Sequence, residues 1–225
     1  MIVFENISKI YPNIVALEKV NLKINSREFV TIVGQSGAGK STLLKLLTVE
    51  ELPTEGRVLL DDVEINSLKS RDLPSLRRKI SSIFQDFKLL SNKTTFENVA
   101  FALEVAGKSR EEISETVPQV LELVGLKNHF NVFPHQLSGG ERQRASIARA
   151  LVLRPDIIIA DEPTGNLDPL NTWDVIRLLV KINELGTTVI LATHNREIVN
   201  TLNKRVISMD KGRIVRDEEN GRYIL

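Results

Sequence analysis

The stretch Gly34-Gln-Ser-Gly-Ala-Gly-Lys-Ser-Thr42 decides the fold of this chain. It follows the β-branched run Phe29 to Val33 and precedes Leu43 to Leu47, whose leucines have helical spacing. Glycines at such a junction let backbone N–H groups surround phosphate oxygens, and the N-terminus of the following helix adds partial positive charge. The pattern G-x-x-x-x-G-K-[ST] between strand and helix therefore predicts a P-loop in an α/β fold rather than a plain glycine-rich turn.

Every residue of this loop is a candidate nucleotide contact. These residues are Gly34, Gln35, Ser36, Gly37, Ala38, Gly39, Lys40, Ser41 and Thr42. Lys40 would contact the outer phosphates and assist catalysis, and the Ser41 hydroxyl would bind Mg²⁺. The expected ligands are ATP and Mg²⁺.

Two carboxylates, Asp161 and Glu162, follow the run Ile157 to Ala160. This run is apolar throughout, as expected for a central strand covered by helices on both faces. Ligands of open α/β sheets bind at the carboxyl ends of the strands. Asp161 is therefore a candidate to hold Mg²⁺ through water, and Glu162 to orient or deprotonate the attacking water. An isolated acidic pair would more simply end a strand; the P-loop favours the catalytic interpretation.

A second possible anion site lies at Leu137-Ser-Gly-Gly-Glu141. Ser138 and Glu141 have capping-box spacing, so an ordinary helix start explains them. The hydroxyl of Ser138, the amides of Gly139 and Gly140 and a helix N-terminus would also suit a γ-phosphate. Since the chain already has one P-loop, this second site suggests a facing subunit.

The remaining chain reads as alternating β and α units. Strands are expected at Phe29 to Val33, Ile80 to Phe84, Ile157 to Ala160 and Thr188 to Ala192, forming a mainly parallel sheet. Short runs at Ile2 to Phe4, Leu22 to Ile24 and Val58 to Leu60 suggest an antiparallel layer.

Between Lys88 and Pro155 the pattern becomes helical, with a capping box at Ser109 to Glu112 and a kink or break expected at Pro118. We therefore expect one domain over residues 1–225, with a core at 1–87 and 155–225 and an inserted helical subdomain at about 88–154.

Composition excludes several classes of protein. Among 225 residues, 30 Lys and Arg face 29 Asp and Glu, which gives no overall field that favours nucleic acid. The chain has no cysteine, so disulfides, thiolate nucleophiles and cysteine-bound metals are excluded. We find neither a signal sequence nor an apolar run near the ~18 residues of a membrane span, so we expect membrane contact only through a partner.

The order and spacing of these motifs resemble the ATP-binding cassette (ABC) ATPases over essentially the whole chain. The matching residues are the P-loop, Gln85, Leu137 to Glu141, Asp161-Glu162, Gly165 to Asp168 and His194. The resemblance implies that Tyr11 stacks on adenine, that Gln85 contacts Mg²⁺ and the attacking water, and that Ser138, Gly139 and Gly140 bind the nucleotide of a partner copy. It also implies that Asp168 lies at the dimer contact and His194 touches the γ-phosphate.

Several of these residues also have ordinary explanations. A lone tyrosine, glutamine or histidine is usually a core or surface residue, and only the joint order favours sites at Tyr11, Gln85 and His194. Asp168-Pro169 also fits the N-cap and first turn of a helix running toward Gly186. Trp173 is interpreted as a core residue of that helix.

Four stretches resemble the cell-division members of the family more than its importers. They are Arg71 to Arg78, Phe84 to Leu90, Thr95 to Ala100 and Arg216 to Tyr223. This resemblance implies a homodimer around ATP, peripheral on the cytoplasmic face of the plasma membrane, that drives an integral membrane subunit to control cell-wall hydrolases. ATPases for lipoprotein release or macrolide export are similar over the same stretches and remain the alternative.

Phe87, Leu89 and Leu90 follow Gln85 and are either a docking segment for the membrane subunit or packing for the helices. The basic cluster Arg71, Arg77, Arg78 and Lys79 is interpreted as a solvated face. A small-molecule kinase would lack Leu137 to Glu141. A soluble cassette acting on DNA or ribosomes would normally carry a coiled-coil insertion, zinc-binding cysteines or a second cassette.

Overall fold

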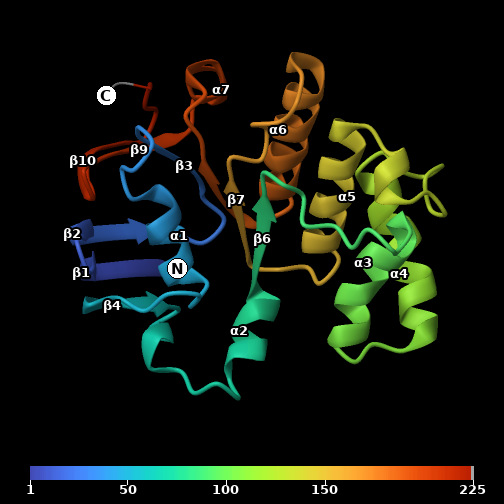
Figure 1. Cartoon of the computed structure of the whole chain (residues 1–225), viewed down its shortest axis with the longest axis horizontal. Helices are drawn as coiled ribbons and strands as arrows, with labels where there is room; N and C mark the ends of the chain where they lie inside the picture. The colour runs from blue at the N-terminus through green and yellow to red at the C-terminus, as the bar shows by residue number, and fades with distance from the viewer. Residues whose placement is uncertain (224–225) are drawn as a thin grey trace.

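The computed structural model describes residues 1–223 and contains two sheets with helices between and beside them (Figure 1). The larger sheet has six strands in the order β10-β9-β3-β8-β7-β6. Their bounds are β3 (Phe29–Val33), β6 (Ile80–Phe84), β7 (Ile157–Asp161), β8 (Thr188–Ala192), β9 (Arg205–Asp210) and β10 (Arg213–Glu218). β9, β3, β8, β7 and β6 are parallel, while β10 pairs antiparallel with β9. The predicted parallel sheet is confirmed.

One expectation about this sheet is wrong. The strand at Ile157 to Ala160 lies between β8 and the edge strand β6, whereas β3 and β8 form the middle pair. All five residues of β3 and of β8 are buried. Full burial thus marks an interior strand, but the order of the strands depends on pairing between distant segments, which an apolar run does not encode.

The antiparallel layer is confirmed as a four-stranded sheet in the order β2-β1-β4-β5. It comprises β1 (Ile2–Tyr11), β2 (Ile14–Ile24), β4 (Glu55–Leu60) and β5 (Val63–Glu64). Its first two strands are much longer than predicted. The register of β1 against β2 shifts between Phe4 and Ile7, and Asn6 between them has a φ of 49°. Such bulges interrupt the polar–apolar alternation from which strand length is read.

Seven α-helices lie within the described residues: α1 (Lys40–Leu47), α2 (Leu73–Lys79), α3 (Thr95–Val105), α4 (Arg110–Leu123), α5 (Gly139–Leu151), α6 (Pro169–Glu184) and α7 (Arg196–Leu202), with short 3₁₀ turns at Ile65–Ser67 and Pro134–Gln136. Predicted N-caps are confirmed at Ser109, Ser138 and Asp168, each of which accepts a hydrogen bond from a backbone N–H of the first turn. None of the described helices is long and apolar enough to cross a membrane.

Of the kink or break predicted at Pro118, the break is wrong, because α4 continues through this residue. Proline removes one backbone donor, but Ile113, Val117 and Leu121 bury one stripe on both sides of it. Burial of that stripe outweighs the loss of one hydrogen bond.

Apolar clusters cover both faces of the parallel sheet. One joins α3, α4, α5 and α6 to the sheet, and the other joins α1 and the antiparallel layer to it. Figure 1 shows α3, α4 and α5 gathered on one side and β1, β2 and β4 on the opposite side. Trp173 is half-buried against the first cluster rather than fully in the core. The division at about residues 88 and 154 remains a prediction.

Candidate functional site

The glycine-rich loop between β3 and α1 has the backbone that its sequence predicts. Gly37 and Gly39 have φ values of 81° and 101°, in the region that side chains disfavour. A Cβ on Gly39 would also lie 2.6 Å from the carbonyl oxygen of Ala16 in β2. Glycine at position 39 is therefore required both by the turn and by the close approach of the antiparallel layer.

Lys40, at the start of α1, is almost fully buried, with 9% of its surface exposed. Its Nζ donates to the carbonyl oxygens of Gly34 at 2.8 Å and Gln35 at 3.2 Å. The ammonium therefore lies inside the curve of the loop, where it can make charge-assisted hydrogen bonds to a phosphate.

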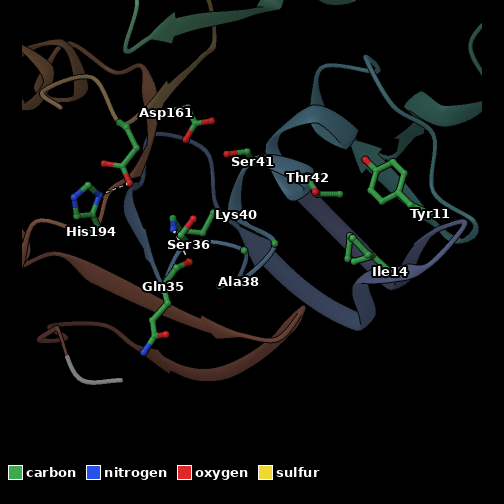
Figure 2. A pocket seen from close by; sticks show the side chains of 14 residues that line it. Tyr11, Ile14, Gln35, Ser36, Ala38, Lys40, Ser41, Thr42, Asp161 and His194 are labelled. Atoms are coloured by element: carbon green, nitrogen blue, oxygen red, sulfur yellow. Dashed lines mark hydrogen bonds and ion pairs between the residues drawn. The ribbon is translucent and has the colours of Figure 1, made fainter. Parts of the chain in front are cut away.

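A cavity of about 700 Å³ opens over this loop. Figure 2 shows Tyr11 and Ile14 on one side of it, Asp161 and His194 on the other, and Lys40 between them. It is lined by Tyr11, Ile14, Ala16, Gln35, Ser36, Gly37, Ala38, Gly39, Lys40, Ser41, Thr42, Asp161, Glu162 and His194. The shape offers an aromatic end, an N–H-rich middle and an acidic end.

Asp161 ends β7 beside the P-loop. Burial raises the pKa of this carboxyl, and a hydrogen bond from Ser41 opposes that effect, as does the charge of Lys40. Its Oδ1 is buried and has no hydrogen-bond partner. An orphaned carboxylate oxygen next to a serine hydroxyl fits a hard divalent cation. Among the described residues, no group of three or more His, Asp or Glu side chains is arranged to hold a metal ion, so phosphate and water oxygens would complete the coordination of such a cation.

Glu162 and His194 meet at the mouth of the cavity. The Nδ1 atom of His194 lies 2.8 Å from Oε1 of Glu162, and the His194 side chain is 70% exposed. Glu162 has a φ of 49°, an uncommon conformation for this residue type, and its N–H donates to the carbonyl of Ala192 at 2.9 Å. Such strain is typical of functional sites, where the surrounding structure holds it.

Gln85 does not line this cavity. Its Nε2 donates to Oδ1 of Asn166 at 3.2 Å, and Nδ2 of Asn166 donates to the carbonyl of Gln85 at 3.2 Å. Gln85 borders a neighbouring hollow of about 310 Å³ that Glu162 and His194 also line. Asn166 was given no role from the sequence, although it lies inside the quoted motif Gly165 to Asp168.

The residues Ser138, Gly139 and Gly140 also lie outside the cavity, at the start of α5. The Ser138 hydroxyl accepts from the N–H of Glu141 at 3.3 Å, and the Glu141 carboxylate accepts from the N–H of Ser138 at 2.8 Å. Asp168 caps the adjoining helix α6 by accepting from the N–H of Asn171 at 3.0 Å. A Cβ on Gly140 would collide with Asn171, so the two helix starts are in direct contact.

Comparison with known proteins identifies this arrangement. The family model described as "ABC transporter" matches residues 17–165. The chain belongs to the ABC transporter ATPase family. As an ABC ATPase it binds and hydrolyses ATP, and the sequence-based resemblance is confirmed.

Relatives of this ABC ATPase are similar along its full length. It is 53% identical over 224 residues to "Cell division ATP-binding protein FtsE" of Bacillus subtilis, covering 99% of this chain and 98% of the relative. It is 49% identical to the protein of the same name from Mycobacterium tuberculosis, covering 99% and 98%. A solved dimer of the ATP-binding cassette MJ0796 bound to ADP and Pi matches with a TM-score of 0.89 and 38% identity, covering 99% of this chain and 100% of that one.

Proposed function

We propose that this ABC ATPase is the energy-supplying subunit of a cell-division complex with an FtsX-like integral membrane protein, and that its ATP cycle controls cell-wall hydrolases. The observation that carries this proposal is the 53% identity to FtsE over nearly the whole of both chains. A transporter for lipoprotein release or macrolide export would use the same ATPase residues and is the second candidate. On either reading the protein is peripheral, at the cytoplasmic face of the plasma membrane.

Within one chain, the cavity divides the labour of ATP binding and cleavage. Tyr11 stacks on adenine, while the backbone of Gly34 to Thr42 and the ammonium of Lys40 hold the phosphates. Ser41 and Asp161 would hold Mg²⁺, which would compensate charge on the leaving and transferred phosphates. This assignment is supported by the orphaned Oδ1 of Asp161 and the enclosed position of Lys40.

The attacking water is handled at the acidic end. Glu162 orients it or accepts its proton, and His194, 2.8 Å from Glu162, contacts the γ-phosphate and fixes the carboxylate. Gln85 would contact Mg²⁺ and the attacking water from the adjoining hollow. It must turn from Asn166 toward Glu162 to do so, because its side chain bonds to Asn166 and lies outside the main cavity.

A second copy of the chain completes the site. Ser138, Gly139 and Gly140 form a second N-terminal anion site that does not line the cavity of its own chain. Two chains arranged head to tail bring this site onto the partner's nucleotide, with Asp168 at the contact. The similar cassette MJ0796 is dimeric with ADP and Pi bound, which supports a nucleotide-bound dimer.

The membrane subunit docks a short helix into a groove of about 590 Å³ bounded by α2, β6, α3 and α5. Phe84, which precedes Gln85, lines this groove with Phe101 and Val105 of α3, which are 40% and 71% exposed. Arg77 and Arg78 also line the groove, so it suits a helix with acidic residues or a carbonyl-rich C-terminus.

The groove differs from the docking segment that the sequence suggested. Phe87, Leu89 and Leu90 do not line it, and Leu89 packs against the core, so the packing interpretation fits Leu89. Arg71, Arg77, Arg78 and Lys79 are exposed, which agrees with a solvated face.

One protein tests the main parts of this proposal. Glu162→Gln should bind ATP without hydrolysing it and elute as a dimer in size-exclusion chromatography with Mg-ATP; a monomer would contradict the dimer. The same protein, used as bait in detergent-solubilised native membranes, should retain an FtsX-like protein. Recovery of a lipoprotein-release or export permease would assign the chain to transport.

Docking in the groove is tested by adding Phe101→Asp to the bait. It should abolish recovery of the membrane protein, whereas Leu185→Asp, at a residue 69% exposed in the C-cap of α6, should not. Equal recovery with both variants would place the docking site elsewhere.

A further inference from the structure

The turn that follows Gln85 has an unusual backbone. Phe87 and Lys88, two consecutive residues with large side chains, have φ values of 61° and 50°. L-residues avoid this left-handed region because Cβ crowds the neighbouring carbonyl, and bulky residues adopt it only where contacts enforce it. The local bonds are the N–H of Phe87 to the carbonyl of Phe84 at 3.3 Å and the N–H of Lys88 to the carbonyl of Asp86 at 2.6 Å.

Helix α5 provides the contacts that hold this turn. The guanidinium of Arg149 donates to the carbonyl of Lys88 at 2.6 Å and to the carbonyl of Phe87 at 3.1 Å. Two residues nearer the N-terminus of α5 also contact this region. Gln143 donates to the carbonyl of Phe84 at 3.4 Å, and the guanidinium of Arg142 lies 5.3 Å from the centre of the Phe87 ring. Within residues 1–223, only the Arg149 side chain donates to the carbonyls of both left-handed residues.

The charged guanidinium of Arg149 bonds to these backbone carbonyls instead of to a carboxylate. No carboxylate forms an ion pair with it among the described residues, and burial lowers the pKa of its guanidinium. A desolvated cation without a carboxylate makes strong bonds to the acceptors that it has, and two of them are the carbonyls of the strained turn. The bonds from Arg149 therefore favour the backbone conformation in which the carbonyls of Phe87 and Lys88 both face its guanidinium.

Arg149 also lines the groove beside Phe84 and Phe101. We propose that Arg149 is a positioning residue that fixes the turn Phe87–Lys88 and, through this turn, the position of Gln85. Arg149 also signals to the ATPase site that a helix of the membrane subunit occupies the groove. The second half of this inference rests on the groove and the Gln85 role proposed above. A helix that enters the groove meets the guanidinium directly, and a change in its two bonds alters the turn and hence where Gln85 lies.

Steady-state kinetics of the isolated protein test the first half. Arg149→Met keeps the length of the side chain and removes the donors; we expect kcat to fall roughly tenfold or more, with the KM for ATP unchanged, because misplacing one catalytic group costs this much. Arg149→Lys should recover part of the loss. Arg110→Met, at an exposed position of α4, should leave kcat unchanged.

A double-mutant cycle with Gln85→Ala separates positioning from general damage. If Arg149 acts through Gln85, the double variant is no slower than the slower single variant. Multiplying effects, or a raised KM with unchanged kcat, would overturn the inference.

Hydrogen exchange gives a readout that does not depend on the role of Gln85. A peptide covering residues 85–90 should exchange faster in Arg149→Lys than in the wild type, while one from β3 should not change. If Gln85→Ala keeps the wild-type kcat, the proposed role of Gln85 is wrong, and equal exchange at 85–90 would then overturn the Arg149 assignment as well.

The second half is tested in the complex with the recovered membrane protein. Arg149→Lys should co-purify at the wild-type level but lose most of the stimulation of ATPase activity by that protein. Lost co-purification would show that Arg149 only supports docking, and full stimulation would show that the signal takes another route; either result overturns this half.

Discussion

Replacing Asp161 by asparagine should stabilise the protein in the absence of nucleotide and divalent cation, although it should abolish Mg-dependent ATPase activity. The Oδ1 of Asp161 is buried without a partner, and burial raises the pKa of the carboxyl. The folded chain therefore bears the cost of an incompletely solvated negative charge. Asparagine has the same size, removes the charge and can keep the bond to Ser41.

The magnitude follows from one buried acceptor without a partner, which costs about 1–3 kcal/mol and more when the acceptor is charged. The nearby Lys40 offsets part of this cost, since its charge favours the ionised carboxylate. We therefore expect the free energy of unfolding to rise by about 1–2 kcal/mol. For a chain of this size, Tm should rise by roughly 2–8 °C.

The assay is thermal unfolding in EDTA without nucleotide, repeated across pH. Because the folded pKa of Asp161 lies above its ordinary value of 3.8, the unfolded chain loses this proton first as pH rises. The wild type should lose stability relative to Asp161→Asn as pH rises through the interval that begins near 3.8, and the two should converge below it. Asp174→Asn, at an exposed position of α6, should shift Tm little at any pH.

The reasoning would be refuted if Asp161→Asn melted at or below the wild-type Tm at neutral pH in EDTA. It would equally fail if the difference between the two proteins were independent of pH. Adding Mg-ATP should reverse the order, since only the wild type gains binding energy from the metal.

Four further substitutions should separate stability from function. Ser138→Ala and Thr94→Ala each remove a capping-box hydroxyl, so each should lower the free energy of unfolding in urea by about 1 kcal/mol. Only Ser138→Ala should reduce ATP-dependent dimerisation. Equal reductions would contradict the proposed site on a facing subunit. Gly39→Ala should lower affinity for a fluorescent ATP analogue at least tenfold, because φ is 101° and Cβ would meet a backbone oxygen at 2.6 Å; unchanged affinity would disprove this. Arg205→Met breaks the ion pairs with Glu28 and Asp217 and should lower the free energy of unfolding in urea by about 2–4 kcal/mol. The folded protein should keep its kcat, and a loss of kcat in the folded fraction would contradict this.

Local chemistry explains which elements could be predicted from the sequence. The strands β3, β6 and β8 have the predicted bounds, and the caps at Ser138 and Asp168 lie where predicted, because each depends on neighbouring residues. The position of β7 in the sheet and the lengths of β1 and β2 depend on distant pairing and on bulges.

In the candidate site too, features that depend on local motifs could be predicted, whereas features that depend on distant contacts could not. The P-loop, Asp161, Glu162 and His194 line one cavity with Tyr11, as a motif-based prediction requires, because parallel strands bring their carboxyl ends to one edge. Gln85 lies beside that cavity, and Ser138 to Gly140 lie outside it, since a single chain holds only part of the proposed two-chain site.

Two residues with no role assigned from the sequence, Asn166 and Arg149, both donate to backbone carbonyls. With Gln143 they donate to the carbonyls of four of the five residues from Phe84 to Lys88. A carbonyl accepts from many residue types, so such bonds leave no motif, in contrast to a phosphate-binding loop, whose glycines are irreplaceable. The conformation of this segment is therefore set by α5 and by the turn before α6. Ser138 caps the N-terminus of α5, and Asp168 caps the N-terminus of α6. In the proposed dimer, a shift of either helix would change the bonds that hold Gln85. The segment would then respond to closure of the dimer on one side and to a helix in the proposed groove on the other.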